Sequence, residues 1–401
     1  MNTSVDPETL RAQVRAWLKQ NVPPGWRAAM TGTGQNAFVA AQRDWFFKFV
    51  EAGYATPHWP QGWPGGGRSL AEQKVIYEET ARADAPRLIL YFVSLYHAAC
   101  TLMECGSEAQ KDKYLPGILK GEIWCQGFSE PNAGSDLASL KTRAELKGDR
   151  YVINGQKTWS TMAQYADRCL LLVRTGKSEP PQGGLTYLLL DMKSKGVSVR
   201  PIPQITGDDE FAEIFFDDVE VPVADRVGED GAGWAVAQAT LSSERGLTLV
   251  ELTQRMRYSL VRFAEVMRER NVQDDPALRR ELGGLIAKVD AACALADQYL
   301  LKRISGDEVP GDASIVKLGY ARTLREFTKL GMRISGLQGQ YFEDFTRGGS
   351  QETGNWTVDF MNSYNWSIAG GSDEIQRNII AERMLGMPRE PKTWQVPGSR
   401  P

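Results

Sequence analysis

The chain has 401 residues, of which 42% are hydrophobic and 24% are charged, and its formal net charge is −3. This composition is typical of a globular protein, and the slight negative charge excludes a general attraction to nucleic acid or anionic membranes. The five cysteines show no CxxC pair or regular spacing, and the two histidines lie far apart, so we expect reduced thiols and no metal site. Because no apolar run reaches the about 20 residues of a membrane span and the N-terminus lacks a signal-peptide pattern, we expect a cytoplasmic protein.

The first third of the chain is predicted to be helical. Asp6 can cap a helix and Pro7 suits its first position, and apolar residues then recur on one face at Leu10, Val14, Trp17 and Leu18. Further helices are expected over residues 37–53, 69–82, 87–104 and 107–120. We therefore expect an N-terminal helical domain over residues 1–123.

Over residues 124–231 the sequence pattern changes from helical periodicity to short segments typical of β-strands. The runs "RCLLLVRT", "LTYLLLDM", "VSVRPI" and "EIFFDDVEVP" are separated by turn residues, which predicts a compact sheet domain. Within "RYVINGQKTW", the dipeptide Asn154-Gly155 is typical of a two-residue β-hairpin turn.

Long helical patterns return over residues 232–401, with helices expected at about 232–270, 276–304, 310–342 and 372–386. The order helical, β, helical argues against a doubly wound parallel sheet, in which strands and helices alternate. The segment "GTGQNA", with Gly32, Gly34 and Ala37, matches the loose dinucleotide pattern but follows no buried strand, so we interpret it as a chance match.

The stretch "WCQGFSEPNAGSDLASLKTRAELKGDRYVINGQKTWSTMAQYADRCLLLVRT", residues 124–175, resembles the acyl-CoA dehydrogenase family. The segments "KYLPGILKGE", "FFDDVEVP" and "GGSDEIQRNIIAERMLG" extend the resemblance over nearly the whole chain. It implies an α+β multidomain fold with an N-terminal helical domain, a central β-barrel-like domain and a C-terminal four-helix bundle. It also implies a tetramer and the α,β-desaturation of an acyl-CoA thioester.

This reaction needs a hydride acceptor, which no side chain can supply, and the resemblance implies FAD. Trp159 alone would be a core aromatic of the sheet domain, and Ser372 with Glu374 alone would be a helix start. By the resemblance, these three residues contact FAD. The complete set of implied FAD contacts is Gln126, Phe128, Ser129, Trp159, Ser160, Thr161, Ser372 and Glu374.

The catalytic base departs from the commonest family pattern. Many relatives carry a glutamate where this chain has Gly370, and a glycine cannot abstract a proton. Long-chain and isovaleryl-CoA dehydrogenases instead place the base in a Glu-Arg pair of the C-terminal domain, and "LSSERGL" resembles that pair, so Glu244 is the expected base. On a continuous helix Glu244 shares a mostly apolar face with Ala237, Thr240, Leu241, Leu247, Thr248 and Glu251, which raises a carboxyl pKa. The alternative is a surface charge on the helix.

The resemblance implies substrate contacts at Ser135, Ser242, Arg245 and Gly371. Arg245 suits the polyanionic CoA, although a solvated surface charge is its ordinary alternative. The sequence does not show which of Tyr91, Leu95 and Tyr96 line the acyl pocket.

Two family features are missing here. The Arg-x-x-Phe-Gly motif, which reaches FAD in a neighbouring subunit, is absent, and Arg279 or Arg280 is the possible substitute; the usual "GGNG" appears only as "GLQGQ". The main interpretation is a dehydrogenase, homotetrameric or heterotetrameric, that passes electrons to an electron-transfer flavoprotein. The alternatives are a poorly catalytic partner subunit of a heteromeric enzyme, and an acyl-CoA oxidase or desulfinase on the same scaffold.

Overall fold

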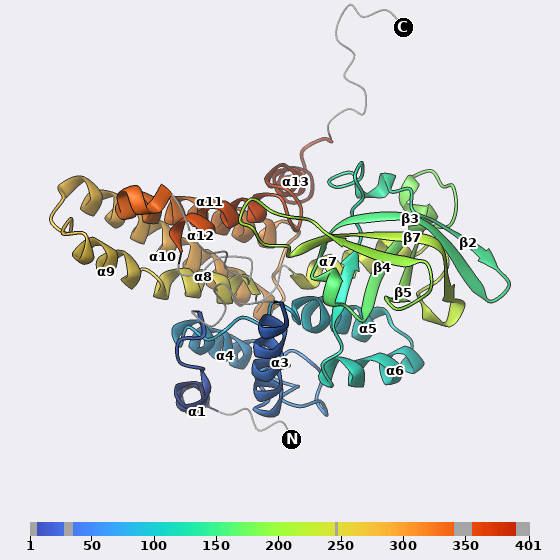
Figure 1. Cartoon of the computed structure of the whole chain (residues 1–401), viewed down its shortest axis with the longest axis horizontal. Coiled ribbons are helices and arrows are strands. Elements are labelled where there is room, and N and C mark those ends of the chain that lie inside the picture. The colour runs from blue at the N-terminus through green and yellow to red at the C-terminus, as the bar shows by residue number, and fades with distance from the viewer. Residues whose placement is uncertain (1–5, 28–34, 245–247, 341–354, 390–401) are drawn as a thin grey trace, which may run out of the picture.

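The computed structural model describes residues 6–27, 35–244, 248–340 and 355–389. Helices come first, then a sheet, then helices again, as the sequence predicted. In Figure 1 the sheet lies at one end of the molecule and the C-terminal helices at the other, with the N-terminal helices beneath both. In the described part of the chain, no helix combines the length and apolar character needed to cross a membrane.

Capping residues set where several N-terminal helices begin. Asp6 accepts a hydrogen bond from the Thr9 amide at 2.9 Å, and Ser69 and Ser107 each form a capping box. The expected helix over 87–104 is instead a turn, a π-helix and a short α-helix, and π-helical turns frequently mark functional sites. The elements are α1 (Pro7–Asn21), α3 (Gln35–Glu51), α4 (Leu70–Arg82), η1 (Val93–Ala98), α5 (Ala99–Cys105) and α6 (Glu108–Leu119).

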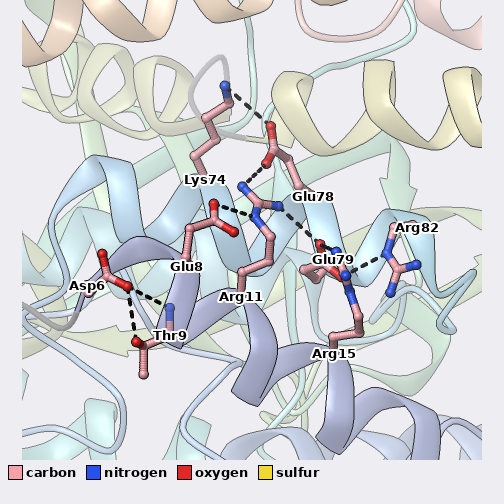
Figure 2. A network of polar contacts seen from close by, with 9 residues as sticks. All are labelled: Asp6, Glu8, Thr9, Arg11, Arg15, Lys74, Glu78, Glu79 and Arg82. Carbon is pink, nitrogen blue, oxygen red and sulfur yellow. Dashed lines mark hydrogen bonds and ion pairs between the residues drawn. The ribbon is translucent and has the colours of Figure 1, made fainter.

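A network of ion pairs between charged side chains connects α1 to α4 (Figure 2). Glu79 is only 1% exposed and accepts from Arg11 at 3.1 Å, Arg15 at 2.8 Å and Arg82 at 2.8 Å. Lys74 extends the network to the C-terminal helices through an ion pair of 2.9 Å with Asp297. The first helix is therefore held to the domain by buried charge as well as by its apolar face.

The sheet follows the order β6-β7-β3-β2-β4-β5-β8 in the described residues, and β1 pairs with β4 in parallel. Its strands are β1 (Trp124–Gly127), β2 (Arg143–Lys147), β3 (Arg150–Thr161), β4 (Arg168–Arg174), β5 (Leu185–Asp191), β6 (Val197–Pro201), β7 (Phe211–Pro222) and β8 (Arg226–Val227).

Strands β4 and β5 are buried on both faces. Leu170 and Leu172 of β4 pack with the N-terminal helices, whereas Leu171 and Val173 pack into a second core on the other face. Successive side chains of a strand point to opposite faces, so a strand covered on both faces must be apolar throughout. This explains the uninterrupted runs "CLLLV" and "LTYLLL".

The predicted hairpin turn at Asn154-Gly155 is wrong, because both residues lie inside β3. The register against β7 shifts between Ile153 and Gly155, and Gly155 has a φ of 146°. Asn154 exchanges hydrogen bonds with Asp218 of β7, at 2.8 and 3.0 Å. The dipeptide forms part of a β-bulge, where glycine is favoured because it can adopt a positive φ, as it can in a turn.

The C-terminal helices share one apolar core. The single helix expected over 232–270 is interrupted by a turn at Ser259 and Leu260, between α8 and α9, and the predicted face of Glu244 includes Leu247, which lies outside the described residues. The elements are α7 (Gly233–Glu244), α8 (Thr248–Tyr258), α9 (Val261–Glu269), α10 (Pro276–Ser305), α11 (Asp312–Ser335), η6 (Gly336–Gln340), α12 (Trp356–Ser363), η7 (Tyr364–Ser367), α13 (Asp373–Ile379) and η8 (Ile380–Met384).

Three hydroxyl groups join the three parts of the molecule at one point. The Thr240 hydroxyl of α7 hydrogen-bonds with Thr101 of α5 at 2.7 Å and with Tyr187 of β5 at 3.0 Å. All three side chains are fully buried. The last turns of α7 are therefore held against both the N-terminal helices and the sheet.

Two glycines of α11 should respond to alanine in opposite directions. A methyl group at Gly331 would lie 2.1 Å from the ring of Trp356, whereas one at Gly319 would meet only the end of Leu295 at 3.4 Å. Gly331→Ala should lower the free energy of unfolding by roughly 1–3 kcal/mol through overpacking. Gly319→Ala should raise it by about 0.5–1 kcal/mol through helix propensity. Denaturant unfolding of both variants measures this, and equal effects would contradict the packing of α11 on α12.

Candidate active site

The segment that follows β1 is held against β3. Gln126 is half-buried in β1, and the ring of Phe128 is buried against Tyr187, with ring centroids 5.7 Å apart. The Ser129 carbonyl accepts from the Thr158 amide at 2.9 Å. Two of the sequence motifs expected to contact FAD, "QGFS" and "TWST", are thus adjacent in space.

A buried ion pair lies beneath this segment. Lys157 of β3 is fully buried, and its Nζ donates to the Phe128 carbonyl at 3.0 Å and to Glu130 Oε1 at 2.9 Å. Glu130 also accepts from the amides of Lys141 at 2.6 Å and Thr142 at 2.8 Å. Burial lowers the pKa of Lys157 to about 8, against the opposing effect of Glu130.

The end of β3 has an unusual backbone. Trp159 has a φ of 62° and is 58% exposed, next to a register shift against β7. A bulky residue with positive φ is a genuine outlier, and such strain clusters at functional sites. The Trp159 ring packs edge-on against Phe211, with ring centroids 6.1 Å apart. Trp159 is therefore a largely exposed aromatic residue and not the core aromatic considered above.

Two expected FAD contacts carry buried polar atoms without a partner among the described residues. These atoms are Gln126 Nε2 and Ser160 Oγ. Buried polar atoms in native proteins nearly always have hydrogen-bond partners, so such orphans call for a ligand or water. An amide donor and a hydroxyl fit the nitrogen and carbonyl atoms at the edge of a flavin ring, and these side chains are therefore compatible with that group.

The segment 370–374 is fixed by side chains behind it. Gly370 and Gly371 have φ values of 64° and 88°, in the left-handed region that favours glycine. Gln376 donates to both of their carbonyls, and the buried Lys317 donates to that of Gly371 at 2.8 Å. Ser372 then caps α13 through the Ile375 amide.

Glu374 and Ser135 are exposed. Glu374 is in the first turn of α13 and pairs with Arg377 at 3.3 Å. Ser135 lies in the loop between β1 and β2. No described contact joins either side chain to the segments around Gln126 and Trp159.

A cavity of about 40 Å³ lies between α4, residues 86–92 and α8. Its wall includes Tyr96, whereas Tyr91 and Leu95 are fully buried in the core. Thr248, the first residue of α8, also lines it. The cavity has room for one or two water molecules and is too small for an acyl group.

Charged groups line the same cavity. Arg255 is 1% exposed and donates to Glu251 at 2.7 Å and to the Ala85 carbonyl at 2.9 Å. Arg87 lies on the opposite wall. Glu210 is not part of this cavity wall, but its carboxyl is close enough to feel Arg87: burial raises the pKa of Glu210 to about 7, with the charge of Asp208 acting in the same direction and that of Arg87 opposing it.

Glu244 is the last described residue of α7, and Thr248, the first residue of α8, is the next described residue. Ser242 and Glu244 follow the buried Thr240 by two and four positions on the same helix. The side chains of residues 242–244, and all of Arg245, lie outside the described residues.

Sequence reasoning missed several residues. Arg270 lines a cavity of about 510 Å³ beside Gln338 of "GLQGQ", whereas Arg279 pairs with Asp274 at 3.5 Å. The prediction that Arg279 or Arg280 replaces the missing arginine contact to FAD stays a prediction. Lys157 was missed because a lysine in a strand is usually read as solvent-facing.

The three parts of the chain match the N-terminal (residues 4–122), middle (125–219) and C-terminal (231–385) domains of acyl-CoA dehydrogenase. The chain belongs to the acyl-CoA dehydrogenase family. FAD is the cofactor, and the enzyme is an oxidoreductase that acts on the CH–CH group of acyl-CoA thioesters.

The similar proteins span nearly the whole chain. Acyl-CoA dehydrogenase IpdE1 of Mycobacterium tuberculosis (strain ATCC 25618 / H37Rv) is 40% identical over 396 residues, which cover 96% of this chain and 99% of that protein. The solved Tcur3481-Tcur3483 steroid ACAD is 30% identical with a TM-score of 0.83, covering 96% and 98% of the two chains. The ChsE4-ChsE5 complex from Mycobacterium tuberculosis is 28% identical with a TM-score of 0.80, covering 97% and 100%.

Proposed function

We propose that the enzyme desaturates an acyl-CoA between its α and β carbons and that Glu244 abstracts the α proton. The observation that carries the proposal is the position of Glu244. Glu244 is the last described residue of the helix that Thr240 fixes to the N-terminal helices and the sheet, and the next described residue along the chain, Thr248, lines the cavity beside Tyr96. Gly370, at the alternative position of the base, has no side chain that could compete for this role.

When bound, FAD supplies the acceptor for the β hydride. On this proposal the flavin is held by Gln126, the backbone of Phe128, Ser129, Ser160 and Thr161. Trp159 packs against the ring, and Ser372 and Glu374 hold the remainder of the cofactor. The orphaned atoms of Gln126 and Ser160 support this assignment.

The thioester is oriented by the segments that flank the base. Ser135, Ser242 and Arg245 are assigned to the CoA portion, where an arginine offers fixed donors to phosphate. Gly371 is assigned to the acyl portion, and the thioester carbonyl is stabilised by a backbone amide without a titrating side chain.

The acyl group is proposed to be bulky and alicyclic. A base on the C-terminal helix suits large or branched substrates by analogy, and one similar solved structure is titled a steroid ACAD. The test is anaerobic bleaching of the flavin by a panel of straight-chain, branched, aromatic and steroid-like acyl-CoAs. The fastest bleaching should come from the alicyclic members, and bleaching by none of the panel would refute desaturation. Peroxide or sulfite release would assign an oxidase or a desulfinase instead.

The enzyme is proposed to assemble with a second, related chain and to pass electrons to an electron-transfer flavoprotein. Two observations favour a mixed assembly. The two solved structures described above are titled as pairs of chains, and this chain lacks the subunit-crossing Arg-x-x-Phe-Gly motif. Mass measurement and flavin content of the chain, purified alone and with the related chain, test this. A stable homotetramer with one FAD per chain would refute the mixed assembly.

A further inference from the structure

The ammonium of Lys157 makes a direct contact with the peptide group that joins Phe128 to Ser129. Its Nζ lies 3.0 Å from the Phe128 carbonyl oxygen, and the side chain is fully buried. Lys157 stands 29 positions further along the chain, on a different strand. The contact is therefore a product of the fold and not of the local sequence.

The geometry of the peptide group fixes where its other end points. Among the described residues, Glu179-Pro180 is the only cis peptide, so the 128–129 peptide is trans. In a trans peptide the C=O and N–H bonds point in opposite directions. The Ser129 amide therefore points away from Lys157, and no described residue accepts a hydrogen bond from it.

A charge on one end of a peptide group strengthens the hydrogen bond made by the other. An ammonium on the carbonyl oxygen withdraws electron density from the peptide, and the N–H becomes a stronger donor. The negative charge of Glu130 does not cancel the pull of the ammonium on the Phe128 carbonyl completely, because the Glu130 carboxylate also accepts hydrogen bonds from two backbone amides. Glu130, together with Cys169 and Arg174 of β4, also acts on the Lys157 ammonium.

We propose that Lys157 is a positioning residue for the flavin, which fixes the Phe128–Ser129 peptide and makes the Ser129 amide a charge-strengthened donor to the ring. This rests on the proposed placement of FAD against Ser129. A stronger donor stabilises the electron-rich reduced ring more than the oxidised one. Lys157 therefore raises both the affinity for FAD and its reduction potential.

The test compares Lys157→Met and Lys157→Arg in the full chain, reconstituted with FAD. The methionine variant should bind oxidised FAD at least tenfold more weakly. In this variant the equilibrium ratio of reduced to oxidised flavin should be tenfold lower, which corresponds to a reduction potential lower by about 30 mV for a two-electron couple. The arginine variant keeps the charge and should restore both values to within about twofold. Lys74→Met, which breaks an ion pair of α4, is the matched control and should change neither.

The pH dependence supplies a second readout if the methionine variant does not fold. In the wild-type enzyme the flavin spectrum and potential should change as Lys157 loses its proton near pH 8. Glu130→Gln removes the charge that favours the ammonium, so this change should move to lower pH. A Lys157→Met variant with wild-type affinity for FAD and wild-type reduction potential would overturn the inference. A flavin spectrum that does not change with pH near 8, in both the wild type and Glu130→Gln, would also overturn it. A wild-type chain that binds no FAD would instead refute the proposed placement of the cofactor.

Discussion

Replacing Glu244 by glutamine should leave FAD bound and acyl-CoA affinity nearly unchanged while bleaching of the flavin by substrate slows by about 10²–10⁴-fold or more. Glutamine has almost the same shape as glutamate but cannot accept the α proton, and general base catalysis alone is typically worth that factor. Anaerobic stopped-flow absorbance measures the bleaching rate, and a separate titration with a non-reacting acyl-CoA measures binding. Near-normal bleaching would refute the role of Glu244.

A second carboxylate makes this test specific. Glu251 lines the cavity and is held by Arg255, so Glu251→Gln removes a nearby negative charge without touching the assigned base. A larger loss in Glu251→Gln than in Glu244→Gln would move the base to α8. Combining Glu244→Gln with Gly370→Glu should recover part of the rate, because many relatives carry their base at that position.

Removing Glu79 should destabilise the N-terminal domain more than removing any other carboxylate of the network in Figure 2. Glu79→Ala leaves Arg11, Arg15 and Arg82 without their shared carboxylate (Figure 2), and breaking a buried ion pair costs about 3 kcal/mol. Since the arginines are partly exposed and can be rehydrated, about 2–3 kcal/mol is expected. Glu8→Ala removes an exposed partner of the same Arg11 and should change stability by less than about 0.5 kcal/mol. Equal effects of the two variants on denaturant unfolding would contradict the network.

The same network predicts a loss of stability in acid. Burial would raise the pKa of Glu79, but hydrogen bonds from Arg15, Arg82 and Arg11 lower it from 4.5 to about 2. The folded state therefore binds this proton less readily than the unfolded state, and the contribution is complete above about pH 4.5 and is lost as the pH falls toward 2. Wild type should lose this contribution over that range, and Glu79→Gln should lack it. Parallel pH profiles for the two proteins would refute the assignment.

The sequence alone was sufficient for the order of the three parts and for the family. Apolar periodicity in the first and last thirds follows from helices that bury one face, and the uninterrupted runs of β4 and β5 follow from a sheet covered on both faces. The cofactor segments were recognisable because they are short, contiguous and carry unusual residues close together. The two segments are adjacent at the Ser129 carbonyl, which accepts a hydrogen bond from the Thr158 amide.

Where a local pattern had two structural outcomes, tertiary packing decided between them. Asn154-Gly155 suits both a hairpin turn and a bulge, and pairing with Asp218 on β7 selects the bulge. The region 232–270 is helical throughout by periodicity, yet a turn at Ser259 and Leu260 separates α8 from α9, and the pattern did not mark this turn.

The sequence alone did not predict which residues from distant segments of the chain contact one another. The burial of Lys157 depends on Glu130 and the Phe128 carbonyl, and the position of Tyr96 on the small cavity depends on how α8 packs against α4. The free energy of each such contact depends on which groups exclude water from it. A linear sequence determines which groups are present, whereas only the folded chain determines which of them share a dry environment.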